Sequence, residues 1–254
     1  EAARASRAAE AAREAEATAA RRLRIAASIW RSALPARPGD VLSLYLTARG
    51  IDLDAIGGVP PALRLAPDLE MWEREGDGPL RPIHRGPAMV ARMGRREFVG
   101  VHRTWITAEG RARFEDGRKV PKKWLGATGR MKGQPVRLAD PRPRMLAGEG
   151  IETTLAALSI TRKAGDATWT AEAALSRDAL AQDWTPPPGT SGVLILGEGS
   201  SRNPAAAEAK AREAKDRLEA AGVRALIRVP GGRWDQDRDY ADVAAEAAAR
   251  GRNV

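Results

Sequence analysis

The chain has 254 residues and a formal net charge of +9, with 42 Lys and Arg against 33 Asp and Glu. It has no cysteine and only two histidines, which excludes disulfides, cysteine-bound zinc and a His-rich metal centre. With those ligands excluded, we expect carboxylates to bind any metal. No stretch approaches the ~20 apolar residues of a membrane span, and no signal-peptide pattern is present, so we expect a cytoplasmic protein.

The positive charge is concentrated in the middle of the chain. Residues 81–144 carry 17 basic and 5 acidic side chains, a net +12, whereas the rest of the chain sums to −3. Such segregation is the electrostatic footprint of a protein that binds phosphate backbones. The alternative is a solvated basic surface without a partner.

The first residues predict helices. An Ala-, Arg- and Glu-rich run without proline or glycine predicts one long helix over residues 1–35, ended by Pro35 and Pro38. Asp40 is placed to cap a second helix, Val41–Ala48, and Gly50 follows it as a C-terminal cap residue.

Residues 36–144 predict a basic region of helix and strand. The Gly- and Pro-rich residues 57–87 predict loop with short strands, and the runs 88–93 and 97–106 predict a hairpin that turns at Gly94. Residues 119–133 place Trp124 and three glycines among Lys and Arg, which is typical of a loop that lies on a nucleic-acid backbone. The nucleic-acid contacts are assigned to Arg103, Lys119, Lys122, Lys123, Trp124, Arg130 and Lys132.

Two tryptophans of this region are interpreted differently. Trp105 lies in a strand-like run and is expected in the core. Trp124 is flanked by lysines and a glycine, so it either stacks on a base or packs in the core.

Residues 145–254 alternate strands and helices. Apolar runs predict strands at 145–147, 168–171, 193–196 and 224–229, and helical patterns cover 152–163, 205–221 and 239–250. This alternation predicts an α/β fold with a Rossmann-like parallel sheet and flanking helices.

Carboxylates follow three of these strands. Glu149 comes after the first strand, Glu198 follows the strand at 193–196 after one glycine, and four aspartates lie beyond the last strand, at 235, 237, 239 and 242. Because ligands of an open parallel sheet bind beyond the carboxyl ends of its strands, these side chains are expected to converge. An acid after a strand is often a helix cap, and for Glu149 alone that explanation is favoured, but the three groups together predict a site for Mg²⁺ or Mn²⁺.

Residues 149–156 read EGIETTLA, and residues 239–242 read DYAD. The first stretch resembles the first motif of the Toprim domain of DNA primases and topoisomerases, and the second is similar to a late signature of phage- and plasmid-type primases. Upstream, residues 45–51, 98–105, 123–126 and 133–138 resemble segments that precede Toprim in those proteins. The resemblance implies Glu149 as general acid/base and Glu198, Asp239 and Asp242 as Mg²⁺ ligands.

The second Toprim motif departs from the family pattern. The family has an Asp-x-Asp there, whereas residues 197–201 read GEGSS. Glu198 can replace the first aspartate, but Ser200 stands where the second is expected and brings no charge. The departure predicts weakened affinity for Mg²⁺ or Mn²⁺, and no zinc is expected.

The sequence therefore predicts a long helix at 1–35, a basic nucleic-acid-binding region at 36–144 and a Toprim domain at 145–254. The leading hypothesis is a primase-like nucleotidyltransferase of mobile-element (phage or plasmid) DNA replication. Its expected partners are single-stranded DNA, nucleotides and a helicase or other replication protein, with no membrane. One alternative is a catalytically degenerate relative that binds DNA or a replication partner without turnover, and another is a Toprim nuclease.

Overall fold

The computed structural model describes residues 2–74 and 76–251. Its α-helices are α1 (Ala2–Ser32), α2 (Val41–Ala48), α3 (Ile151–Lys163), α4 (Pro204–Ala220) and α5 (Tyr240–Gly251), with short helical turns η1 (Ala179–Asp183) and η2 (Pro230–Gly232). Its strands are β1 (Leu34–Pro35), β2 (Leu63–Arg74), β3 (Leu80–Met93), β4 (Gly100–Trp105), β5 (Lys123–Gly126), β6 (Val136–Arg137), β7 (Arg144–Gly148), β8 (Trp169–Ala173), β9 (Gly192–Leu196) and β10 (Ala225–Arg228).

These strands form two five-stranded sheets. The first is antiparallel, in the order β1-β2-β3-β4-β5, and the second has the order β10-β9-β7-β8-β6. In the second sheet, β10, β9, β7 and β8 run parallel, and only β6 is antiparallel. The α/β fold expected for residues 145–254 is therefore confirmed.

The strands β7 and β8 of the second sheet are buried on both faces. Along β7, Leu146 packs in the cluster that includes α3 and α5, whereas Met145 and Ala147 pack in the cluster that includes α4. This alternation follows from the two-residue period of a strand. It explains why the parallel strands read as continuous apolar runs.

The expected elements of the first sheet are present, but residues 57–87 differ from the prediction. The structure has one long hairpin there, with β2 paired to β3 from Leu63 to Arg74. Pro67 lies within a register shift of β2, and Pro82 lies in the part of β3 that β4 does not cover. Proline is tolerated at bulges and at edges, so its presence hides these strands from a pattern analysis.

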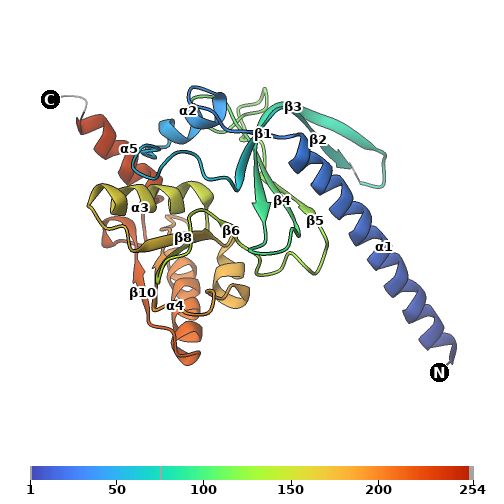
Figure 1. The fold of residues 1–254 in the computed structure, drawn as a ribbon. Coiled ribbons are helices and arrows are strands. Elements are labelled where there is room, and N and C mark those ends of the chain that lie inside the picture. The colour runs from blue at the N-terminus through green and yellow to red at the C-terminus, as the bar shows by residue number, and fades with distance from the viewer. Residues whose placement is uncertain (1, 75, 252–254) are drawn as a thin grey trace.

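Helix α1 is docked by its C-terminal half. Ala26 and Ala33 are buried in a cluster with Trp105 and strands β3 and β4, and the Arg64 guanidinium stacks on Trp30 at 4.3 Å. Residues 6–18 are exposed, and Figure 1 shows α1 running away from the body toward the N-terminus. None of the helices in the described part of the chain combines the length and apolar composition needed to cross a membrane.

One hydrophobic core joins the two sheets. It contains Tyr45 and Leu46 of α2, Met89 of β3, Leu155 of α3 and Ala241 of α5. Helices α2 and α5 meet at Gly50, where a Cβ atom would lie 2.1 Å from the backbone nitrogen of Ala245. The N-terminal and C-terminal parts of the chain are therefore held together at the place where their polar side chains also meet.

Candidate functional site

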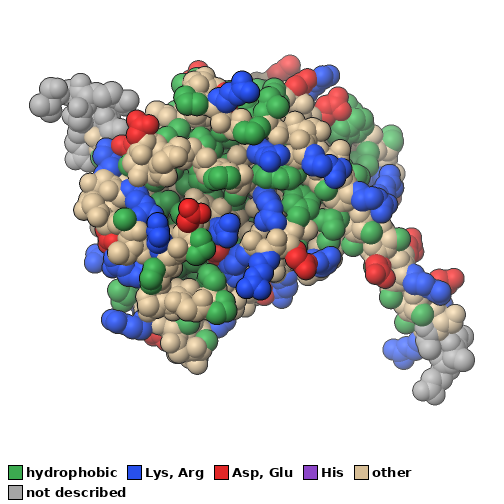
Figure 2. All heavy atoms as spheres, viewed as in Figure 1, with side chains coloured by type: hydrophobic (Ala, Val, Ile, Leu, Met, Phe, Trp, Pro, Cys, Tyr) green, Lys and Arg blue, Asp and Glu red, His purple; other side chains and the backbone are tan. Residues whose placement is uncertain are grey.

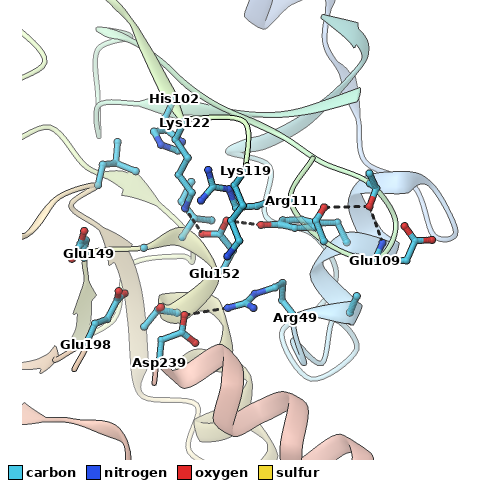
Figure 3. Close-up of a pocket in the computed structure, with 18 of the residues that line it drawn as sticks. Arg49, His102, Glu109, Arg111, Lys119, Lys122, Glu149, Glu152, Glu198 and Asp239 are labelled. Atoms are coloured by element: carbon cyan, nitrogen blue, oxygen red, sulfur yellow. Dashed lines mark hydrogen bonds and ion pairs between the residues drawn. The ribbon is translucent and has the colours of Figure 1, made fainter. Parts of the chain in front are cut away.

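A cavity of about 770 Å³ lies where the two sheets face one another. One side is formed by the carboxyl ends of β7 and β9 and the first turn of α3, and the other by the end of α2, by β4 and by residues 107–122. Its lining includes five acidic and five basic side chains: Glu109, Glu149, Glu152, Glu198 and Asp239, and Arg49, Arg111, Arg113, Lys119 and Lys122. In Figure 3, Glu149, Glu198 and Asp239 lie apart from Lys119, Lys122 and Arg111, and Glu152 lies between the two groups.

Three of the predicted acids form one wall of this cavity. Strands β7 and β9 are neighbours, so Glu149 and Glu198, which follow them, emerge side by side. Asp239 reaches the same wall from the residue before α5. We call Glu149, Glu198 and Asp239 the acidic wall.

The carboxylate of Glu198 is incompletely hydrogen-bonded. Its Oε1 atom is shielded from solvent and has no hydrogen-bond partner among the described residues. Burial and the neighbouring carboxylates of Glu149 and Asp239 raise the pKa of Glu198 to about 7, although the Thr153 hydroxyl and Lys122 oppose the shift. Binding of either a proton or a cation would therefore stabilise this carboxyl group.

Arginines already accompany the other two acids. The Arg177 guanidinium donates to Glu149 at 3.0 Å, and Arg49 donates to Asp239 at 3.1 Å. Burial raises the pKa of Asp239 despite the opposing charge of Arg49. Glu149 is one-third exposed on its side chain, so it is accessible from the cavity.

Asp242 plays a different part from Asp239. The backbone N–H of each residue donates to the carboxylate of the other: Asp239 N–H to Asp242 Oδ2 and Asp242 N–H to Asp239 Oδ1, each at 2.9 Å. This reciprocal pair caps the first turn of α5, in the manner of a capping box. Asp242 does not line the cavity, although Arg49 lies 3.8 Å from its carboxylate.

The remaining aspartates and Ser200 lie outside the cavity lining. Asp235 pairs with Arg233, and Asp237 accepts hydrogen bonds from the backbone and hydroxyl of Ser201. Ser200 N–H donates to the Trp234 carbonyl, and its hydroxyl accepts from Asn203 N–H. The loop after β9 is therefore fixed by both backbone and side-chain hydrogen bonds.

A buried ion pair forms the floor between the two walls. Glu152 accepts from Tyr45 Oη at 2.6 Å and from Lys122 Nζ at 3.0 Å. Burial alone would raise the pKa of Glu152, but Lys122 and the Tyr45 hydroxyl outweigh it and hold the pKa at about 2. Burial and the charge of Lys122 lower the pKa of nearby His102 to about 3, so this imidazole is neutral.

The basic wall is built from residues 107–122. Arg111 donates to the Val120 carbonyl and Arg113 to the Gly117 carbonyl, which orders the loop and leaves both positive charges uncompensated by an acid within the described chain. Lys119 is exposed and has no partner among the described residues. These three side chains make one end of the cavity attractive to phosphate groups.

The other predicted nucleic-acid contacts lie elsewhere. Arg103 is mostly buried beside Trp105, Lys123 pairs with Glu73, Arg130 with Glu97, and Lys132 with Asp183. Trp124 is 45% exposed and packs edge-on against His102 at 5.7 Å. Trp105 is fully buried and donates to the Leu69 carbonyl, so the core interpretation of Trp105 is confirmed.

The donor set of the acidic wall fits a hard, hydrated cation. In proteins Mg²⁺ is usually bound by one or two carboxylates, with water and substrate phosphates as the other ligands. Glu198 and Asp239 could supply those carboxylates, and the shielded Oε1 of Glu198 would gain a partner. Within the described residues, no three His, Cys, Asp or Glu side chains lie close enough to enclose a metal ion.

Several residues of the cavity were not among the predicted site residues. They are Tyr45, Arg49, His102, Arg111 and Glu152, and Arg177, which lies outside the lining, is a further missed residue because it pairs with Glu149. Tyr45, Arg49, His102 and Glu152 lie inside segments that carry the Toprim resemblance, so the resemblance could have identified them as site residues. Nothing in the sequence marks Arg177 as the partner of Glu149.

Comparisons with known proteins give distant similarities. Residues 20–138 match the model of a family described as a domain of unknown function, DUF7146. No curated protein matches the sequence. Among solved structures, the primase fragment of the bacteriophage T7 primase-helicase protein is similar, with 15% identity and a TM-score of 0.44 over 87% of this chain and 77% of that chain. Similarity this low leaves the chemistry to be inferred from the residues of the site.

Proposed function

We propose that this chain is a primase-like protein of the Toprim type, which joins nucleotides on a single-stranded DNA template with the help of a divalent cation. The observation that carries the proposal is the shielded, unpaired carboxylate oxygen of Glu198, beside two further acids and opposite a basic wall. Phosphodiester chemistry needs both features, because phosphates must be attracted while charge that develops on them is neutralised.

The residues of the cavity divide the work by their chemistry. Glu198 and Asp239 would hold Mg²⁺ or Mn²⁺, which would supply a positive charge that orients phosphates. Glu149 is accessible and is oriented by Arg177, which suits a general base that accepts a proton from an attacking hydroxyl. Asp242 is assigned to the cap of α5.

The basic wall would receive the nucleic acid. Lys119, Arg111 and Arg113 approach the cavity from the side opposite the acids. Phosphate contacts of this kind fix position and carry little sequence information. We therefore expect weak sequence preference in the template.

Extension of a single-stranded template tests the proposal. Wild type should incorporate nucleotides only with Mg²⁺ or Mn²⁺, and Glu149→Gln should lower incorporation by about 100-fold or more, the usual contribution of an acid–base residue. Affinity for the oligonucleotide should stay nearly unchanged. Glu219→Gln removes an exposed acid of α4 that pairs with Lys215 outside the cavity, and should leave activity intact. Metal-dependent strand cleavage in place of extension would instead identify a nuclease.

A second candidate is a DNA-binding relative without turnover. Arg177 and Arg49 already neutralise two of the three acids, and Ser200 contributes no carboxylate. If these two guanidinium groups take the place of a metal ion, the fold stays stable but the chain has no catalytic activity. In that case wild type would show no metal-dependent turnover and no Mn²⁺ binding by calorimetry.

A further inference from the structure

A second cavity, of about 790 Å³, lies at the other end of helix α3. It is bounded by residues 56–62, by the turn between β3 and β4, by β6 and by the last turns of α3. One acidic residue, Asp140, lines it. Six arginines line it as well: Arg92, Arg95, Arg96, Arg137, Arg142 and Arg162. We call it the arginine cavity.

Three of these arginines are held by the protein itself. Arg95 forms a bidentate pair with the buried Glu172, Arg92 donates to the carbonyls of Gly94 and Arg96, and Arg162 donates to the Trp169 carbonyl. These contacts build a rigid frame. Only Arg95 has its charge compensated by them.

The other three arginines are available. Arg96, Arg137 and Arg142 are exposed, and none has an acidic partner among the described residues. Burial and the nearby charge of Arg137 lower the pKa of Arg92, which shows that like charges are crowded here. An anion in the cavity would relieve this repulsion.

We propose that the arginine cavity binds the sugar-phosphate backbone of a single-stranded nucleic acid, without reading its bases. Arginine suits this role because its planar guanidinium binds phosphate oxygens through two parallel hydrogen bonds. The rest of the rim, residues 57–61, consists of Gly, Val and Pro and carries no charge that would repel a phosphate.

The lining argues for a polynucleotide over a free nucleotide. It has no aromatic side chain, histidine, asparagine or glutamine that could stack on a base or bond to its edge. A nucleotide site needs such groups to select its base, whereas a backbone site needs only charge. Figure 2 shows Lys and Arg side chains gathered around the position of β6.

The position of the arginine cavity suits a strand that also reaches the first cavity. Glu152 and Arg162 lie near the two ends of α3, ten residues apart, which is about 15 Å along a helix. The inference thus rests on the proposed function in taking nucleic acid as the partner, and adds a second contact along the same strand.

Fluorescence anisotropy with a labelled oligothymidylate, titrated across a range of salt concentrations, tests this. Arg137→Gln with Arg142→Gln should weaken binding and reduce the slope of log affinity against log salt by about 1.4, because each lost phosphate contact with a single strand accounts for about 0.7. Unlabelled oligodeoxyadenylate should compete as well as oligothymidylate. The matched control, Arg31→Gln with Arg224→Gln, removes the same charge from exposed positions outside the cavity and should leave the slope unchanged.

Two results would overturn the inference. In the first, the cavity variant has the same slope as the control variant. In the second, ATP displaces the oligonucleotide from wild type but not from the cavity variant, which would make this a nucleotide site. If wild type binds no oligonucleotide at all, the proposed function fails along with the inference. If wild type binds and extends the template while the cavity variant matches the control, the arginine cavity alone is refuted.

Discussion

Glu198 is the residue at which folding and function compete most directly. Its carboxyl group is placed against Glu149 and Asp239 with one oxygen shielded from water, and its pKa is raised from 4.5 to about 7. The folded chain therefore holds a proton that the unfolded chain releases between these two values. The stabilising effect of that proton is complete below about pH 4.5 and is lost as the pH rises through about 7.

Glu198→Gln should remove this pH dependence. The amide stays neutral, so without divalent cations the variant should be more stable than wild type near about pH 8. Its free energy of unfolding should be higher by at most about 3 kcal/mol, and it should unfold at a higher temperature. The difference should shrink near about pH 5, where Glu198 itself is protonated. Thermal unfolding of both proteins in chelator measures it. A difference of equal size at both pH values would mean that Glu198 is not protonated on folding.

Lys119 and Lys122 lie three residues apart, and the structure separates their roles. Lys122 pairs with the buried Glu152, so Lys122→Ala should cost about 3 kcal/mol of stability because it strands a buried charge. Lys119→Ala should leave stability unchanged, weaken oligonucleotide binding and reduce the salt slope by about 0.7. Denaturant unfolding and anisotropy on both variants make the comparison. Equal stability of the two variants would show that the Lys122–Glu152 pair contributes little.

At the scale of elements, the parallel sheet could be predicted because its strands are continuous apolar runs and its helices have clear ends. Helix α2 could be predicted because Asp40 caps it through Ser43 N–H and Gly50 closes it with a φ of +76°. The β2–β3 hairpin was missed because Pro67, Pro82 and Pro87 are signals of loop. These prolines occupy bulges and uncovered edges, a distinction that depends on strand neighbours and not on local sequence.

The cap of α5 gives a prediction at the same scale. Asp242→Ala should destabilise the protein by about 1 kcal/mol through loss of the bond to Asp239 N–H, and should leave Mn²⁺ affinity nearly unchanged. Asp216→Ala changes an exposed acid of α4 and serves as the control for lost charge. Calorimetric titration with Mn²⁺ decides the matter. A fall in Mn²⁺ affinity as large as that of Glu198→Gln would restore Asp242 as a ligand.

At the scale of the whole molecule, the cavity joins residues that local patterns cannot bring together. Tyr45 contacts Glu152 across 107 positions, and Arg49 contacts Asp239 across 190. The strand-end rule foresaw that Glu149 and Glu198 emerge near Asp239, because it depends only on sheet topology. It did not foresee Arg49 and Arg177, which depend on how α2 and the loop after β8 pack.

Because the acidic wall faces the basic wall, we expect the binding of the metal and the binding of the nucleic acid to be coupled. Without a cation, the acidic wall repels phosphates that the basic wall attracts, so Mn²⁺ should tighten oligonucleotide binding, and the oligonucleotide should tighten Mn²⁺ binding by the same factor. We expect a factor of about five or more, at the lower end of typical coupling energies. Glu198→Gln should abolish the coupling while it keeps cation-free binding at or above the wild-type level, since one repelling charge is gone. Anisotropy titrations with and without Mn²⁺, at constant ionic strength, measure the factor. If Mn²⁺ only weakens binding in both proteins, as a screening salt would, then the two walls do not act on one strand.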